Sequence, residues 1–198
     1  MNVETQDAKR RGLAEDWRCS CALGGCPTRL VCVSHDDQSS EEDVLALLGA
    51  GARAGSGREE DAGGEEEKKL EDVDAASNGN GVTALTMACS RGWSRVVALL
   101  LEKGASVEKA LSDGCTPLYL ACQQGRLAIV CMLLESGAEV DKAVDDGFTP
   151  LHIACRHGHQ AIVHLLLDKG ADIDKATNDG FTPLHIACHQ GHQAIVHL

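Results

Sequence analysis

The sequence predicts an all-α solenoid of helix-turn-helix units joined by short β-hairpins, with a disordered N-terminal region before it. The first observation is a tripeptide that returns every 33 residues, with copies at Thr83-Ala84-Leu85, Thr116-Pro117-Leu118, Thr149-Pro150-Leu151 and Thr182-Pro183-Leu184. A fixed period of this length indicates an array in which each unit buries its apolar face against its neighbours. Such an array has an extended surface and no enclosed pocket, which argues against an enzyme.

The second observation is a helix-start signal at the beginning of each unit. In the third unit Thr149 is a suitable N-cap, and Pro150 suits the first helical position because its missing N–H is not needed there. Leu151, Ala154 and Cys155 then form a short apolar stripe. The sequence therefore predicts a short first helix with one buried face.

The third observation is a second amphipathic helix in the same unit. Gly158 can end the first helix with a positive φ. The apolar residues that follow have helical spacing: Ala161, Ile162, Leu165 and Leu166. Gly170 closes this helix, and the pair Asp179-Gly180 marks the turn that leads into the next unit.

The repeat resembles a known family along much of the chain. Residues 146–155 read Asp-Gly-Phe-Thr-Pro-Leu-His-Ile-Ala-Cys, and Gly158-His159, an apolar run at 162–167 and Gly170-Ala171 follow. This pattern resembles an ankyrin repeat, and the resemblance covers residues 80–198. It implies a β-hairpin and two antiparallel helices per unit, stacked into a curved array that binds other proteins.

The chain divides into three parts. Residues 1–38 show no helical or strand period and are predicted to be a disordered, cysteine-containing segment. Residues 39–79 are predicted to be a degenerate or capping repeat, interrupted by an acidic low-complexity insertion at 53–72. The array follows at 80–198, with units at 80–112, 113–145 and 146–178 and a truncated unit at 179–198.

The last unit stops in the middle of its second helix. Leu198 aligns with Leu165, and the polar capping unit that usually finishes an array does not follow. We therefore expect end-to-end self-association through this end. The same feature favours an alternative in which the chain is the N-terminal part, or targeting arm, of a larger ankyrin-containing enzyme or channel.

Charge is distributed unevenly along a chain whose net charge is −12. Residues 39–75 hold 12 acidic and 4 basic side chains, whereas residues 80–198 hold 12 and 9. The array is thus nearly neutral, and we expect no nucleic-acid partner. The longest apolar run, residues 127–134, is too short to span a bilayer, and the N-terminus does not resemble a signal peptide. The sequence predicts no membrane partner and a location in the cytosol or nucleus.

Ten cysteines offer two candidate sites. One repeat position holds Cys89, Cys122, Cys155 and Cys188, which we interpret as small apolar core residues. The N-terminal set holds Cys19, Cys21, Cys26 and Cys32, with His35 nearby. Its spacing departs from the close ligand pairs of zinc sites, so we expect no metal there. A zinc-binding adaptor is the alternative.

Histidines recur at two repeat positions in the last two units. His152 and His185 follow the Thr-Pro-Leu signature, and His159 and His192 follow a glycine. We interpret all four as structural, because a buried imidazole must find hydrogen-bond partners and neighbouring backbone groups can supply them. The sequence presents no carboxylate or thiol that would complete a catalytic or metal site with them. We expect no catalytic residue and no cofactor.

The predicted function is protein recognition through the concave face of the array, formed by hairpin tips and the exposed ends of the inner helices. The resemblance places partner contacts directly after the hairpin glycine, at Cys115, Phe148 and Phe181. It also places them before the glycine that ends each inner helix, at Ser90, Arg91, Gln123, Gln124, Arg156, His157, His189 and Gln190. Phe148 and Phe181 are the strongest candidates, because an aromatic side chain on a solvent-facing hairpin can anchor a partner. The alternative is a ring that folds against its own hairpin.

Overall fold

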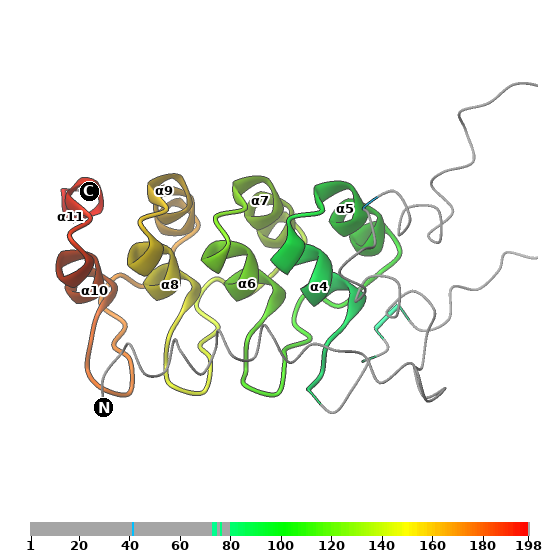
Figure 1. Ribbon diagram of the computed structural model, residues 1–198, viewed down its shortest axis with the longest axis horizontal. Helices are drawn as coiled ribbons and strands as arrows, with labels where there is room; N and C mark the ends of the chain where they lie inside the picture. The colour runs from blue at the N-terminus through cyan, green and yellow to red at the C-terminus, as the bar shows by residue number, and fades with distance from the viewer. Residues whose placement is uncertain (1–40, 42–72, 75, 77–79, 198) are drawn as a thin grey trace, which may run out of the picture.

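The computed structural model describes residues 41, 73–74, 76 and 80–197. Over residues 80–197 the chain forms a row of helix pairs, one pair for each predicted unit (Figure 1). The predicted disorder of residues 1–38 and the predicted insertion at 53–72 lie outside the described residues.

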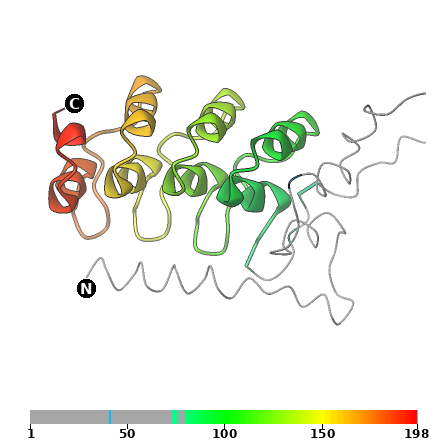
Figure 2. The same cartoon turned by 45° about the horizontal axis from the view of Figure 1, so that its top comes forward.

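Each unit holds an inner helix followed by an outer helix, labelled as in Figure 1. The pairs are α4 (Ala84–Arg91) with α5 (Ser94–Glu102), α6 (Pro117–Gln123) with α7 (Leu127–Glu135), α8 (Pro150–His157) with α9 (Gln160–Asp168), and α10 (Pro183–Gln190) with α11 (Gln193–Val196). The inner helices form one layer and the outer helices another, and Figure 2 shows the same layers from a second direction.

The inner helices begin at the threonine of the repeated tripeptide, as predicted. The side chains of Thr83, Thr149 and Thr182 each accept a hydrogen bond from the backbone N–H three residues later, and the side chain at that later position bonds back to the threonine N–H. Thr116 accepts a hydrogen bond from the N–H of Tyr119 at 3.1 Å. Each cap satisfies an N–H that has no partner inside the helix, which contributes about 1 kcal/mol.

A glycine with positive φ lies between the inner and outer helices of every unit, where a side chain would be strained. These residues are Gly92, Gly125, Gly158 and Gly191, with φ between 70° and 81°. A side chain from the following unit lies directly against three of them: Arg126 against Gly92, His159 against Gly125, and His192 against Gly158. The turn is therefore a helix end and also a contact between units.

One continuous core runs along the array between the two helix layers. Leu85, Leu118 and Leu151 of the inner helices are almost completely buried, and so are Val97 and Val130 of the outer helices. Aliphatic and cysteine side chains make up most of this core, as the low aromatic content predicts. Because each unit shares its core with the next, burial stabilises neighbours together.

The turns between units, which we call the fingers, comprise residues 80–82, 111–115, 144–148 and 177–181. No strand is assigned to the described residues, so the predicted β-hairpins are tight turns. Two backbone bonds close each of the last three. One, of 2.9 Å, runs from the N–H of Leu111, Val144 and Thr177 to the carbonyls of Cys115, Phe148 and Phe181, and the other runs from the N–H of the finger glycine back to the carbonyl of that same first residue. Further backbone bonds join adjacent fingers, from Ser112 to Asn80, Asp145 to Asp113, and Asn178 to Asp146.

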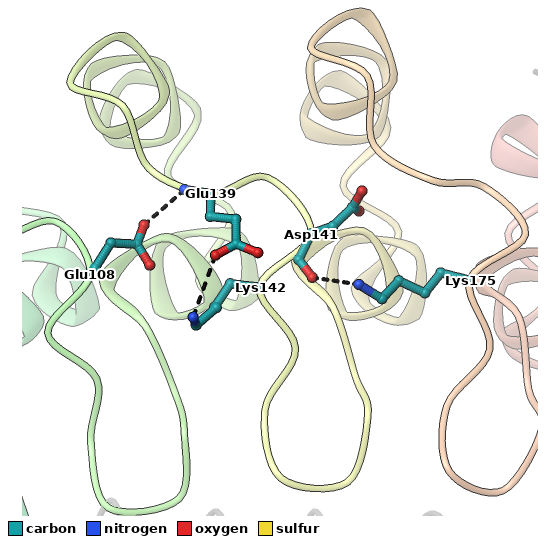
Figure 3. Close-up of polar contacts among 5 residues, drawn as sticks. All are labelled: Glu108, Glu139, Asp141, Lys142 and Lys175. Atoms are coloured by element: carbon teal, nitrogen blue, oxygen red, sulfur yellow. Dashed lines mark hydrogen bonds and ion pairs between the residues drawn. The ribbon is translucent and has the colours of Figure 1, made fainter.

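Acidic side chains also link successive units on the loops that lead from the outer helices to the fingers (Figure 3). The carboxylate of Glu108 accepts a hydrogen bond from the N–H of Glu139 at 2.8 Å, and that of Asp141 accepts one from the N–H of Asp172. The Nζ of Lys175 donates to the Asp141 carbonyl at 2.9 Å. The loops are therefore connected in register, one unit to the next.

The same pattern extends to described residues that precede the array. Asp74 accepts a hydrogen bond from the N–H of Ser106 at 2.9 Å, and Lys109 donates to its carbonyl. Glu41 accepts a hydrogen bond from the N–H of Arg95, in the first turn of α5, at 3.1 Å. These contacts support the prediction that residues 39–79 form a degenerate repeat, which remains a prediction because most of its residues lie outside the described part.

Candidate functional site

The eight polar residues predicted from the inner helices form one row. They are the last two residues of α4, α8 and α10 and, on α6, its last residue and C-cap: Ser90, Arg91, Gln123, Gln124, Arg156, His157, His189 and Gln190. Gln124, His157, His189 and Gln190 are exposed, and the others are half-buried. Stacking brings these helix ends side by side (Figure 1). We call this row and the fingers together the concave face, the surface on which the resemblance predicts partner contacts.

Two ring contacts hold charged and titratable side chains of this row in place. The guanidinium carbon of Arg91 lies 5.1 Å from the centre of the Trp93 ring. The ring of His157 stacks on that of His159, with centroids 5.9 Å apart. Side chains that are ordered before binding lose less conformational freedom on contact with a partner. Both contacts therefore reduce the conformational freedom of Arg91 and His157.

The prediction that Phe148 is exposed is wrong. Its side chain is 5% exposed, and its ring lies 5.5 Å from that of His152, so it folds against its own unit. Cys115, at the same position one unit earlier, is also buried. Phe181 is 45% exposed, because no further finger packs against it within the described residues. Phe148 and Cys115 are thus core residues in this structure, whereas Phe181 is exposed.

Acidic residues of the fingers, which were not among the predicted partner contacts, lie beside the row of helix ends. Asp113 and Asp146 use their carboxylates to close the turn, accepting hydrogen bonds from the N–H groups of Cys115 and Phe148 at 3.0 and 3.3 Å. Asp145 and Asp179 are exposed. The signal was an aspartate directly before the finger glycine in the last three units. Acidic fingers therefore border the row of helix ends.

His152 is structural, as predicted. Its ring is fully buried, and Nδ1 accepts hydrogen bonds from the N–H of Thr149 at 3.1 Å and from the Thr149 hydroxyl at 2.7 Å. With Nδ1 as acceptor, Nε2 carries the proton and donates it to the Phe181 carbonyl at 3.1 Å. Burial is the main cause that lowers the pKa of His152 below its ordinary value. The neutral imidazole thus joins two units.

The second histidine position is structural as well. Nε2 of His159 lies 3.3 Å from the Gln123 carbonyl, and Nε2 of His192 lies 3.0 Å from the Arg156 carbonyl. Both bonds run back to the preceding unit, at the end of its inner helix. These two imidazoles therefore set the relative position of consecutive stretches of the concave face.

Three of the four cysteines in the repeat position are core residues, as predicted. Cys89, Cys122 and Cys155 are buried, and burial raises the pKa of the Cys155 thiol to about 12 and those of the other two further. Such thiols stay protonated and are poor nucleophiles and poor metal ligands. Cys188 is exposed, contrary to the prediction, because no further described unit packs on α10.

Metal-binding groups do not converge in the described part of the chain. No cluster of three or more His, Cys, Asp or Glu side chains that could hold a metal ion occurs among the described residues. The alternative zinc site at Cys19, Cys21, Cys26, Cys32 and His35 lies outside them. No helix of the described residues is long and apolar enough to cross a bilayer.

Comparison with known families agrees with this geometry. The family model described as ankyrin repeats (3 copies) matches residues 41–144 and 140–198. The chain belongs to the ankyrin-repeat family. No curated protein matches it. The match begins at residue 41, well before the first complete described unit. Ankyrin repeats are in general protein-interaction modules and are typically non-catalytic.

Proposed function

We propose that this ankyrin-repeat chain binds a protein partner through its concave face and has no catalytic activity of its own. The observation that carries the proposal is the row of polar side chains from four consecutive inner helices, beside the finger tips. Four of these side chains are exposed, and none of the eight belongs to the hydrophobic core. The packing of the array therefore does not explain why polar residues occupy these positions. Family membership supports the same conclusion.

Two parts of the proposal rest on sequence alone. The proposal places the chain in the cytosol or nucleus, and it expects no catalytic activity because the sequence presents no nucleophile–base pair. The array could serve this binding role by itself or as the targeting arm of a larger ankyrin-containing enzyme or channel. The concave face would be used in the same way in both cases.

The experiment compares two triple variants of matched composition. Gln124→Ala, His157→Ala and Gln190→Ala remove three exposed side chains of the concave face. The control removes exposed side chains of the outer helices, through Gln160→Ala, His164→Ala and Gln193→Ala. All substitutions are at exposed positions, so both variants should fold like the wild type.

Immobilised wild type and the two variants are used to capture proteins from a cell extract, and bound proteins are quantified by mass spectrometry. We expect one set of proteins to bind wild type and control equally, and to fall by about tenfold or more on the concave-face variant if a hot spot is removed. Equal capture by all three proteins would contradict the proposed function.

A further inference from the structure

The fingers and the inner-helix ends carry opposite charges. The finger sequences 80–82, 111–115, 144–148 and 177–181 contain four aspartates and no lysine or arginine. Asp145 and Asp179 are exposed, and Asp113 and Asp146 are half-buried. Asn80 and Asn178, in the first and last fingers, show that neutral side chains also fit these turns. The exposed carboxylate of Asp145 therefore adds charge that the turn does not require.

The inner-helix ends carry only neutral or basic residues. The segments at the inner-helix ends, residues 90–93, 123–126, 156–159 and 189–192, contain three arginines, four histidines, three glutamines and no acidic residue. The arginines are Arg91, Arg126 and Arg156. All lysines of residues 80–198 lie elsewhere, at 103, 109, 142, 169 and 175. Positive charge on this edge is thus supplied by arginine, the side chain best suited to carboxylates.

Helix dipoles do not account for this arrangement. The C-terminal end of any helix carries partial negative charge and favours nearby cations. The outer helices, however, each end in an acidic residue, at Glu102, Glu135 and Asp168, and Lys103, Ser136 and Lys169 follow at their C-caps. Since the dipole is common to both layers, but acids occur at the ends of the outer helices and not at the ends of the inner helices, we attribute the lack of acids at the inner-helix ends to what the concave face contacts.

We propose that the concave face binds a protein segment with two charged edges, a basic edge along the fingers and an acidic edge along the inner-helix ends. This inference rests on the proposed function and names the chemistry of its partner. Complementary charge on both edges fixes the orientation of the segment and disfavours its reversal, because reversal would bring like charges together on both sides. A nucleic acid fits poorly, because its phosphates would meet the finger carboxylates.

Charge-reversal variants test each edge separately in the full chain. The finger variant is Asp145→Lys with Asp179→Lys, and the helix-end variant is Arg126→Glu with His189→Glu; all four positions are exposed. The controls make the same kinds of change on the outer side, at exposed positions of the outer-helix ends. They are Glu135→Lys with Asp168→Lys, and Lys103→Glu with Lys169→Glu.

The probe is a phage-displayed library of random peptides long enough to span the fingers. Peptides are selected on the wild-type chain and then measured individually against every variant at low and physiological salt. We expect selected peptides to carry basic and acidic residues in separate groups. Their binding should fall by about tenfold on the finger and helix-end variants, more at low salt, and by less than about twofold on the controls.

The outcomes separate this inference from the function on which it rests. Peptides that lose binding to the triple variant Gln124→Ala, His157→Ala and Gln190→Ala, but respond to the charge reversals no more than to their controls, would overturn the two-edged partner and leave the proposed function standing. If none of the selected peptides binds the triple variant more weakly than the wild type, the result would count against both the two-edged partner and the proposed function. Enrichment of uniformly acidic or uniformly basic peptides would also overturn the inference.

Discussion

At the scale of single residues, His152 shows how one side chain can serve two units. The ring caps its own helix through Thr149 and donates to the carbonyl of Phe181 in the next finger. In the first unit Thr86 occupies the corresponding position and completes the same capping box with Thr83, at 2.9 and 3.2 Å. Threonine and histidine at this position therefore both complete the helix cap, whereas the hydrogen bond to the next finger is made by histidine.

This difference predicts a pH dependence of stability. Because the pKa of His152 is lower in the folded than in the unfolded chain, its stabilising effect is complete above the unfolded-state pKa of about 6.5 and is lost as the pH falls below that value. The loss is at most about 1.4 kcal/mol for each pH unit. We expect His152→Thr, which keeps the cap, to reduce the drop in the free energy of unfolding between pH 7.5 and 5.5.

Urea unfolding at the two pH values measures the effect. His185→Thr is the matched control, because His185 makes the same cap with Thr182 but is exposed. It should leave the pH dependence close to that of the wild type. The explanation fails if the two variants change the pH dependence equally.

At the scale of elements, sequence alone predicts the starts and ends of the helices well. Threonine followed by proline or alanine, and a glycine nine residues after the threonine, are local signals that act within one unit. The position of Phe148 was not predictable in this way. Its burial depends on packing within the stacked array, and a side chain on a finger can face either solvent or the core without any change in local sequence.

The residues of the candidate surface also differ in whether local sequence predicts them. The helix-end residues from Ser90 to Gln190 could be placed from the resemblance, because a fixed position in a helix fixes its place in the row. The aspartates of the fingers are not predicted as part of this surface, because the local sequence explains each of them as a turn residue. Only the stacked structure shows that Asp145 and Asp179 share one edge with the other fingers.

The glycines at the inner-helix ends allow a test of the contacts between units. Gly158 and Gly191 end nearly identical helices, with φ of 74° and 76°. A Cβ on Gly158 would lie 2.6 Å from the His192 ring, whereas a Cβ on Gly191 would meet nothing within 4 Å. We expect Gly191→Ala to lower the free energy of unfolding by about 1–2 kcal/mol, the cost of a left-handed alanine, and Gly158→Ala to lower it further.

A double-mutant cycle identifies the source of the extra cost. Combining Gly158→Ala with His192→Ala should remove the steric part and give a total smaller than the sum of the single effects. Chemical denaturation supplies all the free energies required. Equal costs for Gly158→Ala and Gly191→Ala would show that the histidine moves away without penalty.

At the scale of the whole molecule, stability passes from unit to unit through shared interfaces. Residues 146–165 and 179–198 differ at only two positions, 156/189 and 157/190. Their burial differs nonetheless: Leu151 is 1% exposed, whereas Leu184 at the same repeat position is 46% exposed. The difference arises from neighbours, since α8 packs against both α6 and α10, and among described residues α10 has a neighbouring inner helix on one side.

This asymmetry predicts that the last unit of the 198-residue chain opens more readily than the one before it. Its outer helix α11 has four residues, too few for a helix to be stable by itself. The exposed side chains of Phe181 and Leu184 also offer an apolar surface for end-to-end association. Amide hydrogen exchange in residues 182–198 should therefore be much faster than in residues 149–167, at a protein concentration low enough to keep the chain monomeric.

A variant whose last unit is covered by an added capping unit is the control for this prediction. A polar capping helix pair added after Leu198 should slow exchange in residues 182–198, raise the melting temperature and abolish concentration-dependent association, while changing exchange in residues 149–167 much less. The physical reason is that a repeat unit gains most of its stability from the surfaces it shares. Equal protection of the two stretches in the original chain would instead mean that the fourth unit is stable with a single neighbour, and that interface coupling is weaker than its burial pattern indicates.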